Sequence, residues 1–296
     1  MSHEHNHNHT LTSLNRAFTV GITVNLLFVV AEFAAGLYTQ SMGLLSDAGH
    51  NLSDVASLML AMLAFRLAKV RPSRKYTYGY KKSTILVSLL NAVILLVAVG
   101  VIVAESVEKF LRPQPVEGGV IVAVAGVGVL INAFTAWLFM KDRKRDLNIK
   151  SACLHMVADA LVSAGVVVSG VIIIYTGWYF IDPVIGLLVA AVIVYSTWSL
   201  LQDSIRLSLD GVPKDIDRNE IEALVRSIPE VEDIHHLHIW ALSTTETALT
   251  AHVVVSDTSR MEAVKSRIKY LLRDHAVSHV TLEFETGETD CPDGCV

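Results

Sequence analysis

Residues 46–54 read "SDAGHNLSD" and place two aspartates and a histidine inside sequence that is otherwise apolar. With their apolar neighbours, from residue 42 to residue 65, they form a segment long enough to cross a membrane as one helix. Ionisable side chains are costly in a bilayer, so in membrane helices they usually face the interior of a bundle and have a function there. The stretch therefore predicts a buried polar site inside a helical membrane bundle.

The composition of the whole chain also indicates a membrane protein. Of its 296 residues, 52% are hydrophobic and only 18% are charged, which is unusual for a soluble protein of this length. The formal net charge is −5, and the basic residues cluster in short loops instead of forming a stripe. We therefore expect a lipid bilayer around the chain and no nucleic acid as a partner.

Six segments are apolar over about 20 residues, the length of a membrane-spanning helix. The six predicted spans are residues 16–38, 42–65, 84–107, 118–140, 151–175 and 183–201. Residues 1–15 are polar and rich in histidine, without the apolar core of a signal peptide, so we expect an uncleaved tail there. The membrane domain then covers residues 16–210.

The basic residues of the loops predict the orientation of the bundle. The loops after the second and fourth spans are basic, whereas the loops after the first and fifth spans carry no lysine or arginine. Loops rich in lysine and arginine stay in the cytoplasm. With six crossings, both termini are then cytoplasmic.

Residues 211–286 have a different pattern, in which two amphipathic helices and three strands follow one another in the order αββαβ. We expect a small two-layer α/β domain in the cytoplasm. One face of its strands is apolar, with Leu249 and Val253, and the other carries His252, Glu283 and Glu285. Residues 287–296 form a short tail that contains cysteines.

Two predicted spans carry the same pair of residue types at the same spacing. His50 and Asp54 are four residues apart in the second span, and so are His155 and Asp159 in the fifth. This spacing places both side chains on one face of each helix. If the faces meet, two imidazoles and two carboxylates converge, a donor set that suits tetrahedral Zn²⁺. The alternative is a pair of hydrogen-bonded patches that join helices.

Asp47 lies one turn before His50 in the same span. A carboxylate at this position could accept a hydrogen bond from the imidazole and orient it toward a metal ion. It could equally be a polar contact between helices.

Several segments resemble the cation diffusion facilitator family, especially its zinc-transporting bacterial and vertebrate members. They are "LLSDAGHNLSDVASL", "KYTYGYKKSTIL", "HMVADALVS" and "HLHIWALS". The resemblance covers nearly the whole chain. It implies a six-helix membrane bundle, a metallochaperone-like cytoplasmic domain and a homodimer. It also implies that His50, Asp54, His155 and Asp159 form the transport site, with a preference for Zn²⁺ over Cd²⁺.

The function that follows is zinc/proton antiport, which moves Zn²⁺ out of the cytoplasm by alternating access. Metal ligands must be deprotonated, so zinc and protons compete for one site. We expect the inner membrane of a bacterium, with an organelle membrane as the alternative. Two other functions stay open: a membrane-anchored zinc sensor or scaffold, and an intramembrane metalloenzyme. The enzyme is disfavoured because the site offers four ligands, and the chain has no H-E-x-x-H motif.

The resemblance also implies a regulatory zinc site in the cytoplasmic domain. His235, His252 and Glu283, with Glu285, match positions that hold zinc in relatives, although some relatives have histidine where this chain has Glu283. The alternative is a set of solvated side chains on an exposed strand face. Successive residues of a strand point to opposite faces, so His235, His236 and His238 cannot all bind one ion, and we expect His236 and His238 to be solvated.

Three further features carry weaker predictions. Lys82 and Asp210 match a lysine–aspartate pair of relatives, which could lock the two domains near a dimer interface or could be solvated charges. The loop after the second span lacks metal-binding residues, so we expect no metal site in it. The terminal tails carry histidines and two cysteines that could bind zinc or be dispensable: His5, His7, Cys291 and Cys295.

Overall fold

The computed structural model describes residues 7–39, 42–112, 118–140, 142–144, 146–178 and 180–287. Within these ranges, the side chains of 7–16, 36, 38, 39, 42–47, 49, 50, 53, 118–121, 124, 166 and 182 are not described. The chain divides into two compact units. One contains the residues up to 69 and 86–201, and the other contains 70–85 and the residues from 202 on.

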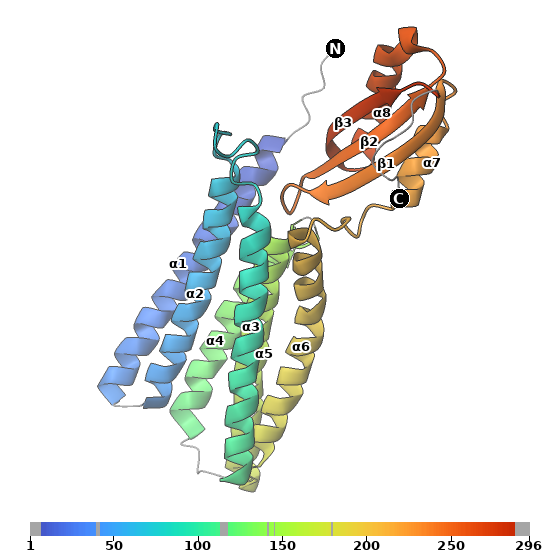
Figure 1. Ribbon diagram of the computed structural model, residues 1–296. Coiled ribbons are helices and arrows are strands. Elements are labelled where there is room, and N and C mark those ends of the chain that lie inside the picture. Colours follow the sequence, from blue (N-terminus) through green and yellow to red (C-terminus); the bar gives the residue numbers. More distant parts are fainter. Residues whose placement is uncertain are drawn as a thin grey trace. The chain divides into compact units, whose positions relative to one another are not determined.

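The first unit is built from long helices, which Figure 1 shows running side by side. They are α1 (His7–Thr39), α2 (Met42–Ala68), α3 (Ser83–Leu111), α4 (Gly118–Met140), α5 (Leu147–Thr176) and α6 (Ile181–Ser208). α1 packs against α2 and α4, and α5 packs against α4 and α2. The six predicted helices are therefore present, and the second and fifth are neighbours.

Four of the described helices contain stretches that are long and apolar enough to cross a membrane. These stretches are Ala17–Ala35, Ser83–Leu111, Leu147–Thr176 and Pro183–Ser208. In α4 the described apolar stretch, Ala125–Met140, is shorter, and α2 contains the polar residues 46–54.

Apolar side chains hold the helices together in two clusters. In the first, the ring of Phe18 in α1 packs 5.6 Å from that of Phe65 in α2 and 4.8 Å from that of Phe139 in α4, measured between centroids. In the second, Leu95 of α3 and Ile193 of α6 lie with side chains of α5. The burial of these side chains fixes the positions of the helices that carry the polar residues.

Two helices begin earlier than expected. α5 begins at Leu147 instead of Ser151, because the Asp146 carboxylate caps it by accepting hydrogen bonds from the backbone N–H groups of Asn148 and Ile149 at 2.6 and 3.3 Å. α5 ends at Thr176 and is followed by Gly177, whose φ of 67° suits a left-handed helix cap. α1 begins at His7, whereas the apolar pattern predicted that the first span begins at Arg16.

The second unit contains the predicted αββαβ domain, and the predicted element order is confirmed. Its elements are α7 (Arg218–Arg226), β1 (Val231–Ala241), β2 (Thr247–Val255), α8 (Met261–Asp274) and β3 (Val277–Glu285), with a short 3₁₀ helix, Thr258–Arg260, before α8. The sheet order is β1-β2-β3, with β1 antiparallel and β3 parallel to β2 (Figure 1). Ile221 of α7 and Ile268 of α8 pack with the apolar strand face, where Leu249 and Val253 are almost fully buried.

A β-bulge interrupts the pairing of β1 with β2 between His235 and His238. His236 has a φ of 51° and leaves the regular strand geometry there. The expected alternation of the histidines is therefore wrong at this point. His235 and His236 both bring their rings close to His252, at centroid distances of 5.3 and 4.9 Å.

The segment between α2 and α3 belongs to the same unit as the α/β domain. The ammonium of Lys81 pairs with the Glu246 carboxylate, and the hydroxyl of Thr84 accepts a hydrogen bond from the Thr244 backbone at 3.1 Å. These contacts tie the segment to the β1–β2 turn.

Candidate metal centre

Three of the four predicted ligands converge inside the first unit. Asp54 of α2 and His155 and Asp159 of α5 have possible ligand atoms that all lie within 4.8 Å of one another. His155 Nε2 lies 2.6 Å from Asp54 Oδ1 and 4.0 Å from Asp159 Oδ2. The three residues are between 2% and 6% exposed. We call Asp54, His155 and Asp159 the membrane cluster.

The membrane cluster is held in place by apolar packing on the same two helices. Leu58 of α2 and Met156 of α5 are almost fully buried in one core cluster. Leu58 lies one turn after Asp54, and Met156 directly follows His155. The four-residue spacing places His155 and Asp159 on the same face of α5, as the sequence predicts. The packing of α2 against α5 brings Asp54 to that face.

The donor set of the membrane cluster suits a divalent cation. One imidazole nitrogen and two carboxylates are ligands that Zn²⁺ prefers, and zinc bonds of about 2 Å place tetrahedral donors about 3.3 Å apart. The described donor atoms need only small movements to reach that geometry. Without the ion, the short contact between His155 and Asp54 satisfies part of the hydrogen bonding of two buried groups.

Two predicted members of this site lie outside the described side chains. His50 and Asp47 are in α2, one and two turns before Asp54, but only their backbone is described. Their contribution as fourth ligand and as orienting carboxylate stays a prediction.

Glu32 of α1 is a further buried carboxylate, which the motifs of the sequence did not single out. It is 2% exposed, and its Oε2 accepts a hydrogen bond of 2.7 Å from the amide of Asn51 in α2. Asn51 follows His50 directly and lies one turn before Asp54. The signal was available, because an acidic residue in the apolar run "LLFVVAEFAAGL" meets the same criterion that singled out residues 46–54.

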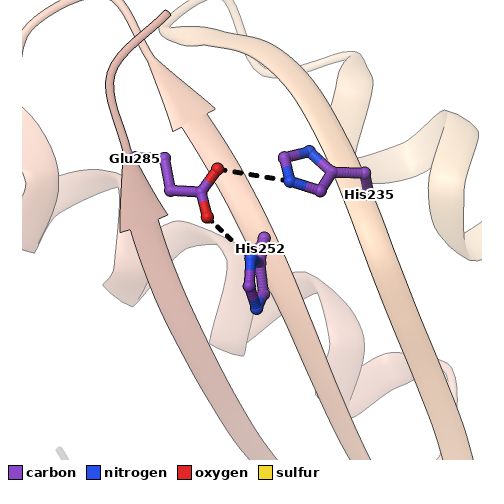
Figure 2. A group of neighbouring side chains, drawn as sticks. All are labelled: His235, His252 and Glu285. Atoms are coloured by element: carbon purple, nitrogen blue, oxygen red, sulfur yellow. Dashed lines mark hydrogen bonds and ion pairs between the residues drawn. The ribbon is translucent and has the colours of Figure 1, made fainter. Parts of the chain in front are cut away.

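A second cluster lies on the sheet of the α/β domain, where His235, His252 and Glu285 come from three neighbouring strands (Figure 2). The Glu285 carboxylate lies between the two rings, with Oε1 2.6 Å from His252 Nδ1 and Oε2 3.2 Å from His235 Nε2. We call these three residues the sheet cluster. Their side chains are between 9% and 21% exposed, so they are reached by solvent.

The remaining candidates of this domain lie at the margin of the sheet cluster. Glu283 is 72% exposed, with its Oε2 3.6 Å from His252 Nε2. The His236 ring stacks on His252 and lies 4.7 Å from the ring of His238. The structure therefore favours Glu285 over Glu283 as the carboxylate of this site.

The last candidates have different outcomes. Lys82 Nζ lies 2.5 Å from Asp210 Oδ1, so the structure brings this pair together. His5, Cys291 and Cys295 lie outside the described residues, and His7 is described only as the first residue of α1.

Comparison with known proteins identifies the family. Residues 18–207 match the cation efflux transmembrane domain, and residues 213–286 match the cytoplasmic domain of cation efflux proteins. The chain is 36% identical to the zinc transporter ZitB of Escherichia coli, covering 98% of this chain and 95% of that protein.

Two further relatives have names that are not limited to zinc. The cadmium, cobalt and zinc/H⁺-K⁺ antiporter of Bacillus subtilis is 33% identical, over 95% of this chain and 92% of that protein. The metal cation efflux system protein CzcD of Cupriavidus metallidurans is 34% identical, over 95% of this chain and 89% of that protein. The family consists of transporters and not of enzymes. The chain is thus a member of the cation efflux family, with a membrane domain of apolar helices and a small cytoplasmic α/β domain.

Proposed function

We propose that this protein is a zinc/proton antiporter that exports Zn²⁺ from the cytoplasm by alternating access. The observation that carries the proposal is the convergence of Asp54, His155 and Asp159 from two packed helices inside the membrane domain. His50 supplies the fourth ligand, which completes a tetrahedral set of two nitrogens and two oxygens. The names of the relatives, which include zinc transport and proton antiport, support this assignment.

Competition between zinc and protons at one site couples the two fluxes. His155 Nε2 lies 2.6 Å from Asp54 Oδ1, so a proton and a zinc ion cannot both lie between these two atoms. Metal ligands must be deprotonated, so loading zinc displaces protons from the site and unloading zinc lets protons return. If the site opens to one side of the membrane at a time, this competition becomes exchange.

We infer the orientation and assembly from the loops and the relatives. The basic loops after α2 and α4 place both termini in the cytoplasm, and the bacterial relatives favour an inner membrane. We propose a homodimer because the family resemblance implies one, and residues 213–286, which match the family's cytoplasmic domain, would join the two subunits.

The sheet cluster is proposed as a regulatory zinc site. His235, His252 and Glu285 present two nitrogens and one carboxylate to an ion that reaches them from the cytoplasm, and exposed Glu283 could complete the set. The same observation is what favours the alternative function, a membrane-anchored zinc sensor. A measurement of zinc flux distinguishes the antiporter from the sensor, because a sensor does not need to transport zinc.

The decisive experiment measures zinc uptake into proteoliposomes loaded with a zinc-sensitive dye, with and without an imposed pH gradient. The native chain is compared with His50→Ala and Asp159→Asn. We expect gradient-driven uptake that both substitutions abolish. Stoichiometric zinc binding without any uptake by the native chain would instead establish the sensor.

A further inference from the structure

Three buried oxygen atoms beside the membrane cluster have no hydrogen-bond partner among the described residues. They are Asp54 Oδ2, Ser57 Oγ and Asn91 Oδ1. The three residues are 2%, 5% and 4% exposed. Ser57 lies one turn after Asp54 on α2, and the Asn91 amide of α3 approaches the Ser57 carbonyl oxygen at 3.5 Å. Ser57 and Asn91 therefore lie where α2 meets α3, and Ser57 is one helical turn from Asp54 of the membrane cluster.

This place is short of hydrogen-bond donors. The Asn91 amide nitrogen already faces the Ser57 carbonyl, and the Ser57 hydroxyl can donate only one hydrogen bond, whereas Asp54 Oδ2 and Asn91 Oδ1 can only accept. Buried acceptors without partners are unfavourable, and native proteins usually satisfy them with an ordered water or an ion. These oxygens lack hydrogen-bond donors. A cation that keeps part of its water shell would provide them, because its waters donate O–H hydrogen bonds and its charge attracts the oxygens.

The polar surface continues from Asn91 toward the start of α3. Buried Ser88 lies one turn before Asn91, whereas the buried residues that follow Asn91 are the apolar Ala92, Leu95 and Val99 until Ser106 near the other end of the helix. Ser88 and Asn91 lie toward the start of α3, which joins the end of α2 through the basic loop. The polar lining therefore leads from Asp54 toward the end of the bundle that carries this loop.

We propose that Ser57 and Asn91 form a second cation site, which holds a hydrated divalent ion between the basic-loop end of the bundle and the membrane cluster. The inference rests on the proposed transport function. Neutral oxygens hold a hydrated ion more weakly than an imidazole and two carboxylates do. The ion therefore stops at this second site with its waters and moves on to Asp54, His155 and Asp159, where the waters are replaced by ligands.

The test compares Asn91→Leu, which removes the oxygen at similar volume, with Asn91→Asp, which keeps two oxygens. In proteoliposomes, Asn91→Leu is expected to lower kcat/KM for zinc about tenfold and Ser57→Ala about threefold, whereas Asn91→Asp stays within about twofold of the native value. Equilibrium zinc affinity of the purified full chain in detergent, measured by dye competition, is expected to change less than about twofold in all three variants. Asn25→Leu is the matched control, because Asn25 is a buried asparagine that bonds Thr135 of α4 at 3.0 Å.

Each outcome decides the proposal. Native kcat/KM in Asn91→Leu overturns it, and so does an equal loss in Asn91→Asp, which would assign Asn91 the role of amide donor. A loss of equilibrium zinc affinity in Asn91→Leu also overturns it, since the residue would then shape the membrane cluster itself. Asp159→Asn keeps the two proposals apart, because transport by that variant contradicts the transport site and not the second cation site.

Discussion

The membrane cluster and the sheet cluster use the same chemistry in opposite surroundings. Each brings three donor atoms within 4.8 Å of one another, with histidine and carboxylate in both. The side chains of Asp54, His155 and Asp159 are between 3% and 6% exposed, whereas those of His235 and His252 are 21% and 19% exposed. Solvent access, and not ligand type, distinguishes the two.

This difference determines what each cluster can do with an ion. Charges buried inside a membrane helix bundle must be balanced, which fits the proposed exchange of one cation for another at the membrane cluster. Water reaches the sheet cluster, so protons that zinc displaces there pass into the surrounding solvent and are not carried across a membrane. We therefore propose exchange at the buried site and sensing at the more exposed one.

The largest expected effect breaks the membrane cluster. Asp54→Asn or Asp159→Asn removes an anionic ligand at nearly constant volume, and we expect zinc uptake to fall at least about 100-fold. His252→Asn, the matched change in the sheet cluster, is expected to keep uptake at saturating zinc within about threefold. Uptake is measured in proteoliposomes under a pH gradient. Equal losses in both clusters would remove the distinction between exchange and sensing.

The second effect concerns zinc held by the sheet cluster. Glu285→Gln is expected to lower its zinc affinity about 10- to 100-fold, because Glu285 contacts both imidazoles. Glu283→Gln is expected to change it less than about threefold, because Glu283 is 72% exposed and 3.6 Å from His252. Calorimetry is done on full-length protein carrying Asp159→Asn, so that only the sheet cluster and any weaker sites bind. A larger loss in Glu283→Gln would reverse the assignment of the carboxylate.

Sequence periodicity was sufficient where the ligands lie on one helix. The spacing of His155 and Asp159 required only a helical α5, and the matching pair on α2 indicated which helices meet. The αββαβ order followed from periodicity in the same way. Periodicity does not predict contacts between different helices. Nothing in the spacing of Glu32 and Asn51, or of Ser57 and Asn91, shows that these residues face each other.

The strand histidines could not be placed for a different reason. In a regular strand, side chains alternate between the two faces, so His235 and His236 would point to opposite faces. The bulge instead brings both rings close to His252. This bulge contains a residue with positive φ, and that residue is His236 and not the glycine that usually marks such a position in a sequence.

The third effect perturbs the sheet cluster without changing a ligand. His236→Val places a β-branched residue at a φ of 51°, which costs about 1–2 kcal/mol and favours a regular strand that moves His235. We expect the zinc affinity of the sheet cluster to fall about tenfold. His236→Gly fits the same backbone and is expected to keep the native affinity. A loss in the glycine variant as large as in the valine variant would mean that the His236 ring itself contributes to binding.

The smallest effect concerns the ion pairs of the second unit. Lys82 and Asp210 have side chains 47% and 56% exposed, so Asp210→Asn is expected to lower the free energy of unfolding by only about 0.5 kcal/mol, and by less at high salt. Asparagine is chosen because Asp210 has a φ of 57°, which asparagine tolerates. Lys81 and Glu246 are 28% and 39% exposed, so Lys81→Met is expected to cost more than Lys82→Met. Denaturant unfolding of purified full-length protein at two salt concentrations measures these differences. A salt-independent loss above about 2 kcal/mol for Asp210→Asn would show that this pair is shielded from solvent in the assembled protein, as a lock at a dimer interface requires.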